Sequence, residues 1–471
     1  MDARSLESEP RSLVDRVMAD VAGRIAAREL APGARLPSIR RLAAALAVSP
    51  STIVEAYDRL VAEGAVVARR GSGFYVAPQL RPLSLAALGP RLDRAIDPLW
   101  IMRQSLDASE DLLKPGCGWL PDDWMPIAAI RRATRALARA SSATLAEYGP
   151  PLGFAPLRQQ ITRRLAERGI ATAPDQILLT DSGSQAIDLV CRYLIEPGDA
   201  VLVDDPCYFN FQAVLRAHRA VAVGVPRTPE GPDLEAFDRA AAEHRPRLYL
   251  TNAALHNPTG TCLAPAVAHR LLKLAEAHDI VVVEDDIFAD FETAPGPRLA
   301  AFDGLERVVH LASFSKTLSA AVRVGYVAAR PDWIEGLTDL KLATTFGNAE
   351  PSARLVHALL TDGSYRRHVD GLRSRLAAAT GPVVRRLAAA GLTLWAPPAG
   401  GMFLWARLPA GLDSAAVSRA ALAEGVLLAP GDVFSVSRTA GRYLRFNVAQ
   451  SSAPRVFEVL ERAMEACAAT G

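Results

Sequence analysis

The residues of this chain with the clearest chemical potential lie in the stretch 311–325, LASFSKTLSAAVRVG, which contains Lys316. The chain has 49 arginines and only four lysines, so a lysine at this position is unusual for a protein whose basic residues are nearly all arginine. A lysine amine can lose its proton and attack a carbonyl carbon, whereas an arginine guanidinium stays charged. Ser313 and Ser315 flank it. The pattern indicates a nucleophilic amine, with an ordinary surface lysine as the alternative.

Three consecutive carboxylates follow an apolar run in VVVEDDIFADF, namely Glu284, Asp285 and Asp286. Ionised carboxylates at the end of a buried strand need a cationic partner, and a protonated pyridine nitrogen would provide one. The alternative is that these acids cap the helix that follows, which is common for one of them and less so for all three.

A turn rich in glycine and serine occurs in LLTDSGSQAI, between an apolar run and a helical stretch. The residues are Ser182, Gly183, Ser184 and Gln185. A turn of this kind at a helix N-terminus presents N–H groups and hydroxyls to a phosphate. Such turns also begin many helices that bind no ligand, so the motif alone leaves both readings open.

The elements that must position these residues form a pattern from about residue 105 onward. Short runs rich in valine and isoleucine alternate with longer helical stretches rich in alanine and arginine. This alternation predicts an α/β domain over 105–471 with a mostly parallel central sheet, whose ligand site lies at the carboxyl ends of the strands. From about residue 350 the pattern predicts a smaller C-terminal α+β lobe.

The first part of the chain has a different organisation. Residues 11–78 predict three helices and a two-stranded hairpin, with Ser38 and Ser49 as helix N-caps. Residues 11–80 hold ten arginines and six acids, a weak indication of nucleic acid binding. The stretch 79–104 contains several prolines and no clean periodicity, which predicts a linker.

Composition narrows the class of protein further. The chain has 471 residues, 50% of them hydrophobic and 22% charged, with a net charge of +2, which is typical of a globular protein with more than one domain. Its five cysteines show no CxxC pair, so we expect neither disulfides nor a metal site, in a reducing cytoplasm. No secretory signal or long apolar run is visible, so no membrane association is expected.

Taken together, the motifs from 148 to 445 resemble fold-type I aminotransferases, which depend on pyridoxal 5′-phosphate (PLP). The resemblance implies that Lys316 is the lysine that binds the cofactor covalently, that Asp285 pairs with the pyridine nitrogen, and that Arg445 in LRFNVA binds a substrate carboxylate. The remaining cofactor contacts that it implies are Asn257 (ring oxygen), Tyr208 (ring stacking), Tyr148 (phosphate of the neighbouring subunit) and Gly183, Ser184, Gln185, Ser313, Ser315 and Arg323 (phosphate).

One position departs from that family. Its members usually have a tyrosine two or three places after the aspartate, where this chain has Ile287 and Phe288. Phenylalanine keeps the ring but cannot donate a hydrogen bond to the cofactor, so transaminase turnover is left open.

The segment from 31 to 77, APGARLPSIRRLAAALAVSPSTIVEAYDRLVAEGAVVARRGSGFYVA, resembles the GntR-type winged helix. The resemblance implies a recognition helix that begins near Ser49 and a wing at 70–73. The DNA contacts that it implies are Arg40, Arg41, Ser49, Ser51, Thr52, Arg69, Arg70 and Gly71.

A winged helix followed by an aminotransferase-like domain resembles the MocR subfamily of bacterial regulators. The resemblance implies a head-to-tail homodimer that binds double-stranded promoter DNA and senses PLP or a small amino compound, the latter as its external aldimine. Two alternatives stay open: an active PLP-dependent aminotransferase with an accessory DNA-binding module, and a DNA-binding protein whose enzyme domain no longer binds PLP.

Overall fold

A computed structural model describes residues 12–26, 29–31, 33–69, 72–77, 100–106 and 111–469. The chain divides into two compact units, Met1–Gly89 and Pro90–Gly471. None of the helices within these described ranges is long and apolar enough to cross a bilayer.

The first unit is the predicted winged helix, and this prediction is confirmed. Its elements are α1 (Leu13–Ala26), α2 (Ile39–Leu46), α3 (Pro50–Ala62) and the antiparallel hairpin of β1 (Val66–Arg69) and β2 (Gly73–Val76). The Ser49 side chain accepts a hydrogen bond from the Thr52 amide at 3.1 Å, so this serine begins α3 as its sequence position predicted.

The large sheet of the second unit has eight strands in the order β3-β10-β9-β8-β7-β4-β5-β6. Neighbouring strands from β9 across to β5 run parallel, whereas β10 is antiparallel to both β9 and β3, and β6 is antiparallel to β5. The strands are β3 (Ile177–Thr180), β4 (Ala200–Asp205), β5 (Val221–Thr228), β6 (Gly231–Pro232), β7 (Leu248–Thr251), β8 (Val281–Asp285), β9 (Val308–Ser313) and β10 (Gly325–Ala328).

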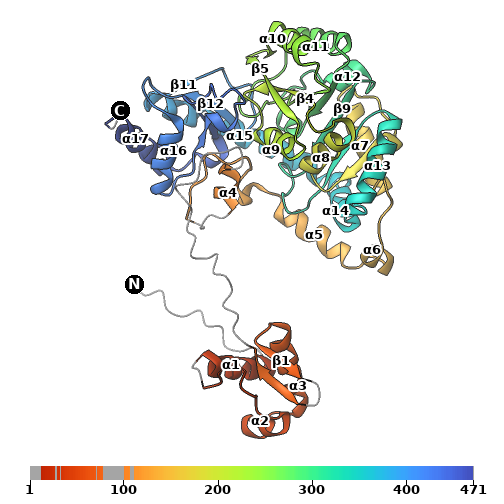
Figure 1. The fold of residues 1–471 in the computed structure, drawn as a ribbon, viewed down its shortest axis with the longest axis vertical. Helices are drawn as coiled ribbons and strands as arrows, with labels where there is room; N and C mark the ends of the chain where they lie inside the picture. Colours follow the sequence, from red (N-terminus) through yellow and green to blue (C-terminus); the bar gives the residue numbers. More distant parts are fainter. Residues whose placement is uncertain are drawn as a thin grey trace. The chain divides into compact units, whose positions relative to one another are not determined.

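Helices cover both faces of this sheet (Figure 1). Alternate residues of each strand face opposite ways, so Leu202 and Val282 join one apolar core while Val203 and Val283 join the other. The surrounding helices are α5 (Ile127–Leu137), α6 (Ser142–Ala146), α7 (Ala155–Ala166), α8 (Gly183–Leu194), α9 (Phe209–Ala217), α10 (Leu234–His244), α11 (Pro265–Ala277), α12 (Leu299–Asp303), α13 (Pro331–Thr345) and α14 (Glu350–Thr361).

The C-terminal lobe contains a second, antiparallel sheet in the order β11-β12-β14-β13, drawn in blue beside the large sheet in Figure 1. Its elements are α15 (Ser364–Ala389), β11 (Thr393–Leu394), β12 (Phe403–Arg407), α16 (Ser414–Ala423), β13 (Ala429–Pro430), β14 (Tyr443–Asn447) and α17 (Pro454–Ala468). The predicted fold class, a winged helix plus an α/β aminotransferase-like domain with a smaller lobe, is thereby confirmed.

The structure corrects the end of the predicted linker, 79–104. Helix α4 covers Trp100–Leu106, and both Trp100 and Ile101 are buried in an apolar cluster of the second unit. Adjacent large apolar side chains give this segment enough buried area to fold against the domain. Residues 78–99 lie outside the described part.

Candidate functional site

Lys316 lies in the turn that follows β9, and its side chain is half-buried. Removal of the amine from water lowers its pKa to about 8, and the positive charges of Arg445 and Arg323 act in the same direction. A lysine with this pKa has about a tenth of its amine in the neutral, nucleophilic form at pH 7.

The three carboxylates at the end of β8 have three different surroundings. Glu284 accepts hydrogen bonds from the amides of Leu299 and Ala300, at 2.8 and 3.0 Å, and so caps α12. Asp286 is bound by Arg298 at 2.9 Å and by His310 at 3.2 Å, which holds its pKa well below the usual range. The capping alternative therefore holds for one of the three acids only.

Asp285 is the carboxylate that lines the candidate site. Its Oδ1 accepts a hydrogen bond from the Ile287 amide at 3.1 Å. In the part of the chain that the structure describes, no arginine, lysine or histidine forms an ion pair with it. Burial without a cationic partner raises the pKa of Asp285 to about 7.

Arg445 lies on β14 and is buried. Its Nη1 donates to Asn257 Oδ1 and its Nη2 to the Gly116 carbonyl, both at 2.7 Å. The guanidinium also lies 4.4 Å from the ring centre of Phe403 and 4.7 Å from that of Phe434. Desolvation lowers its pKa to about 10 without neutralising it, so Arg445 is a fixed cation with a defined orientation.

The turn at the start of α8 lies beside the turn that carries Lys316. A Cβ atom at Gly183 would lie 3.7 Å from the Cβ of Ser313. Gly325 pairs with both Thr180 of β3 and Ser313 of β9, and a Cβ there would lie 2.7 Å from the backbone carbon of Ser182. Glycine at 325 is therefore what lets the two turns approach each other.

Three of the other predicted phosphate contacts make hydrogen bonds around these turns. The hydroxyls of Ser313 and Ser315 are 2.8 Å apart, and Ser313 donates to the Val324 carbonyl at 3.1 Å. The Gln185 amide donates to the Ser182 hydroxyl at 3.0 Å, while the Gln185 side chain accepts from the Asp181 amide at 2.6 Å. The amides of Asp181 and Gln185 are thereby engaged, so the first-turn amides of Gly183 and Ser184 are the ones that could face an anion at this turn.

The three remaining predicted cofactor contacts, Ser184, Arg323 and Tyr148, are more exposed than the residues described above. Ser184 is exposed and accepts from the Asn210 side chain at 3.4 Å, and Arg323 is exposed with a left-handed backbone at φ 55°. Tyr148 is 81% exposed and does not line the cavity; its ring lies 5.0 Å from that of Phe346.

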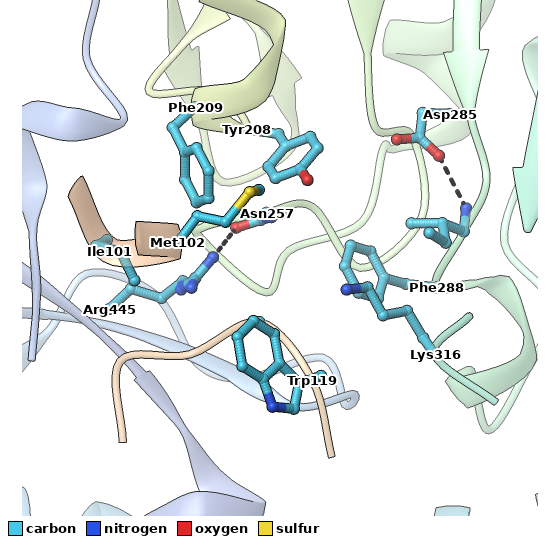
Figure 2. A pocket seen from close by; sticks show the side chains of 12 residues that line it. Ile101, Met102, Trp119, Tyr208, Phe209, Asn257, Asp285, Phe288, Lys316 and Arg445 are labelled. Atoms are coloured by element: carbon cyan, nitrogen blue, oxygen red, sulfur yellow. Dashed lines mark hydrogen bonds between the residues drawn. The ribbon is translucent and has the colours of Figure 1, made fainter. Parts of the chain in front are cut away.

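Five of the predicted site residues line one pocket, whose space of about 510 Å³ includes its opening to solvent: Tyr208, Asn257, Asp285, Lys316 and Arg445. Figure 2 shows Lys316 and Arg445 on opposite sides of it, with Tyr208 and Phe209 on one wall and Trp119 on the other. The cavity thus combines an amine, a carboxylate and a guanidinium between aromatic surfaces.

Sequence reasoning missed Ile101, Met102, Gly118, Trp119 and Phe209, which also line the cavity. Ile101 and Met102 belong to α4, whose seven residues are too few to show a helical period. The sequence signal for these two residues is the dense group of large apolar residues near the end of the predicted linker, 79–104. Phe288, noted for its lack of a hydroxyl, lines the cavity and packs edge-on against Phe403.

The predicted DNA contacts that the structure describes in the first unit lie on α2, at the start of α3 and at the end of β1. Arg40, Arg41, Ser49 and Ser51 are exposed, Thr52 is half-buried, and Arg69 lies over the Tyr75 ring at 4.4 Å. The Ser49 hydroxyl lies 2.7 Å from that of Ser51 and 2.8 Å from that of Thr52. Arg70 and Gly71 lie outside the described residues.

Because the pKa of Lys316 is lowered, the rate at which its amine is acylated in the protein without cofactor should depend on pH in a characteristic way. Below pH 8, its acylation rate should rise about tenfold per pH unit, because only the neutral amine reacts, and it should level off above about pH 8. Pulse labelling with acetic anhydride, read by peptide mass spectrometry, measures this, with the exposed Lys273 as internal reference. A Lys316 rate that kept rising to pH 10 would contradict the assignment.

Comparison with known proteins matches both units. Residues 117–462 match the family of class I and II aminotransferases, and residues 13–76 match the gntR family of bacterial regulatory proteins. The HTH-type transcriptional regulator YdcR of Escherichia coli (strain K12) is 32% identical over 437 residues, which cover 89% of this chain and 91% of YdcR. The regulator YdfD of Bacillus subtilis (strain 168) is 27% identical, covering 89% of each chain.

Solved structures similar to this chain include aminotransferases. LysN, the α-aminoadipate aminotransferase of Thermus thermophilus, superposes with a TM-score of 0.72 at 27% identity, covering 82% of this chain and 99% of LysN. The kynurenine aminotransferase of Pyrococcus horikoshii gives the same TM-score at 25% identity, covering 83% of this chain and 98% of that chain.

Proposed function

This chain belongs to the MocR-type regulators of the GntR family, which join a GntR helix-turn-helix to a class I and II aminotransferase domain, and from that premise we propose that it binds promoter DNA and senses PLP with an amino compound. The observation that carries the sensing part is the cavity of the second unit. It places a lysine of pKa about 8, a buried carboxylate without a cation and a buried arginine together.

The residues present fit PLP. Asp285 is buried without a cationic partner, so a protonated ring nitrogen would supply the charge that its surroundings lack. The amides that begin α8, with Ser313 and Ser315, would hold the phosphate. Asn257 would bind the ring oxygen and Tyr208 would cover one face of the ring.

When bound, PLP supplies an aldehyde carbon that exchanges one amine for another and a ring nitrogen that carries positive charge. Lys316 provides the amine that is exchanged, and its lowered pKa keeps part of it neutral. Asp285 holds its negative charge toward the ring nitrogen, and Arg445 orients the carboxylate of the incoming amino compound. For DNA binding to respond, the amino compound must bind two conformations of the protein with different affinity.

We also propose a head-to-tail homodimer. The aromatic pair of Tyr148 and Phe346 is 81% and 63% exposed, which is unusual for two adjoining large rings and fits a surface that a second copy covers. A dimer also provides two recognition helices for a repeated operator.

A gel shift with the full chain and DNA from upstream of its own gene tests the regulatory proposal. We expect retention of the DNA, with a change in affinity when PLP is added. Arg40→Ala should weaken retention about 5- to 150-fold, because a contact to a base or phosphate is worth roughly 1–3 kcal/mol.

Arg16→Ala is the matched control for that variant, since Arg16 is an exposed arginine on α1 of the same unit. It should retain DNA as the unmodified chain does. No retention of upstream DNA by the unmodified chain would refute the proposal.

A further inference from the structure

The part of the cavity not needed for the cofactor is apolar, and this bears on which amino compound it accepts. Among the described residues that line the cavity, the charged ones are Asp285, Lys316 and Arg445. Under the proposed function each of the three already has a partner, namely the ring nitrogen, the exchanged amine and the ligand carboxylate. Any further polar group of the ligand must therefore find its partner among the remaining lining residues.

Those remaining residues offer few such partners. Around Arg445, Figure 2 shows Ile101, Met102, Phe209 and Trp119, none of which carries a charge. Asn257 is occupied on both sides of its amide, because its Oδ1 accepts from Arg445 at 2.7 Å and, under the proposed function, its Nδ2 donates to the ring oxygen. A second carboxylate buried here would lose its hydration without gaining a cation, which is strongly unfavourable.

The apolar walls are also well supported. Ile101 is 2% exposed and packs, with Trp100, into a cluster that includes Phe209, Trp405 and Phe434. The rings of Phe209 and Phe434 are 5.6 Å apart, and Phe434 also lies over the Arg445 guanidinium. The same packed cluster therefore fixes both the carboxylate site and the wall beside it, so the wall has a definite shape.

We propose that the effector is an α-amino acid with one carboxylate and an apolar side chain, which lies against Ile101, Met102, Trp119 and Phe209. This inference rests on the proposed function, since it assumes that Lys316 and Arg445 bind the amine and the carboxylate. An apolar side chain gains affinity here by burying its surface, and contact with Met102 brings it against α4.

The test compares three amino acids of similar length: L-methionine, L-glutamine and L-glutamate. Each is titrated into the full chain loaded with PLP, and the change in visible absorption gives its Kd. We expect methionine to bind at least tenfold more tightly than glutamine, and glutamate to bind most weakly. Equal affinities, or tighter binding of glutamate, would overturn the proposal.

Two variants at Met102 sharpen the test, because this side chain is only half-buried and should tolerate exchange. Met102→Arg adds a cation to the wall, so glutamate should become the tightest of the three ligands. Met102→Leu keeps the wall apolar and should preserve the original order. An unchanged order in Met102→Arg would contradict the placement of the ligand side chain.

The same titration separates this inference from the function on which it rests. If the protein takes up PLP but shows no preference among the three ligands, only the effector class is wrong. If it takes up no PLP at all, the proposed function and this inference both fail.

Discussion

Lys316→Ala is expected to abolish covalent uptake of PLP completely, and with it any effect of PLP on DNA retention. The amine of Lys316 is the one in the cavity, where it faces Asp285 and Arg445. The substitution also removes a charge that burial disfavours, so the free energy of unfolding of the apo protein should not fall. Borohydride reduction followed by mass spectrometry should find one phosphopyridoxyl group on the unmodified chain and none on the variant.

Lys273→Ala is the matched control, because Lys273 is an exposed lysine on α11. This variant should keep the full mass increase and the full response of DNA retention to PLP. A phosphopyridoxyl group still attached within the cavity of Lys316→Ala would exclude Lys316 as the attachment site. Unaltered DNA retention by the apo form of Lys316→Ala would show that the DNA-binding unit is intact, and an unaltered free energy of unfolding would show the same for the second unit.

Asp285→Asn is expected to change two properties in opposite directions. Burial raises the pKa of Asp285 from 3.8 to about 7, so the native state binds its proton more tightly than the unfolded state does. The ionised form therefore destabilises the apo protein, increasingly as pH rises from about 4 to 7 and fully above that. Asparagine keeps the bond from the Ile287 amide and carries no charge. At pH 8, the free energy of unfolding of apo Asp285→Asn should exceed that of the unmodified apo chain by up to about 4 kcal/mol.

The affinity for PLP should move the other way. Asparagine cannot balance a cationic ring nitrogen, so the Kd of Asp285→Asn for PLP should rise about 10- to 100-fold. Thermal unfolding with and without PLP measures both effects in one experiment: the apo variant should melt higher than the unmodified chain, and PLP should stabilise it less.

The neighbouring acid provides the control. Asp286 is paired with Arg298, so Asp286→Asn leaves that buried guanidinium with less negative charge and should cost about 3 kcal/mol at pH 8. If Asp285→Asn destabilised the apo protein as Asp286→Asn is expected to, Asp285 would have a purely structural role.

The sequence predicted the architecture well because the strands of the large sheet are continuous apolar runs that end in polar residues. The runs ending at Asp285 and Ser313 are strands β8 and β9, and their carboxyl ends meet at the cavity. The reversed direction of β10 could not be predicted, since a short buried strand has the same pattern in either direction. Nor could α4, whose place depends on contacts with residues far along the chain, such as Trp405.

Scarcity of lysine is by itself a weak guide to the reactive amine. Lys341 is buried more completely than the half-buried Lys316, and desolvation lowers its pKa to about 8 as well. Its Nζ, however, donates to the Leu179 carbonyl at 3.1 Å and to the Asn348 side chain at 2.7 Å, away from the residues that line the cavity. What distinguishes Lys316 is its place after β9, beside a carboxylate without a cation.

The pairing of β3 with β10 also bears on how the protein is made. Ile177 pairs with Ala328, and Thr180 pairs with Gly325. Strand β3, the first strand of the sheet in chain order, therefore cannot form this pairing until the ribosome has synthesised β10, much later in the chain. Lys316 is synthesised only 12 residues before Ala328, the last residue of β10. We therefore expect that the turn at Gly183 and the lysine are brought together late in translation, after most of the domain has emerged. A nascent chain stalled before β10 should then be unable to acquire the cofactor.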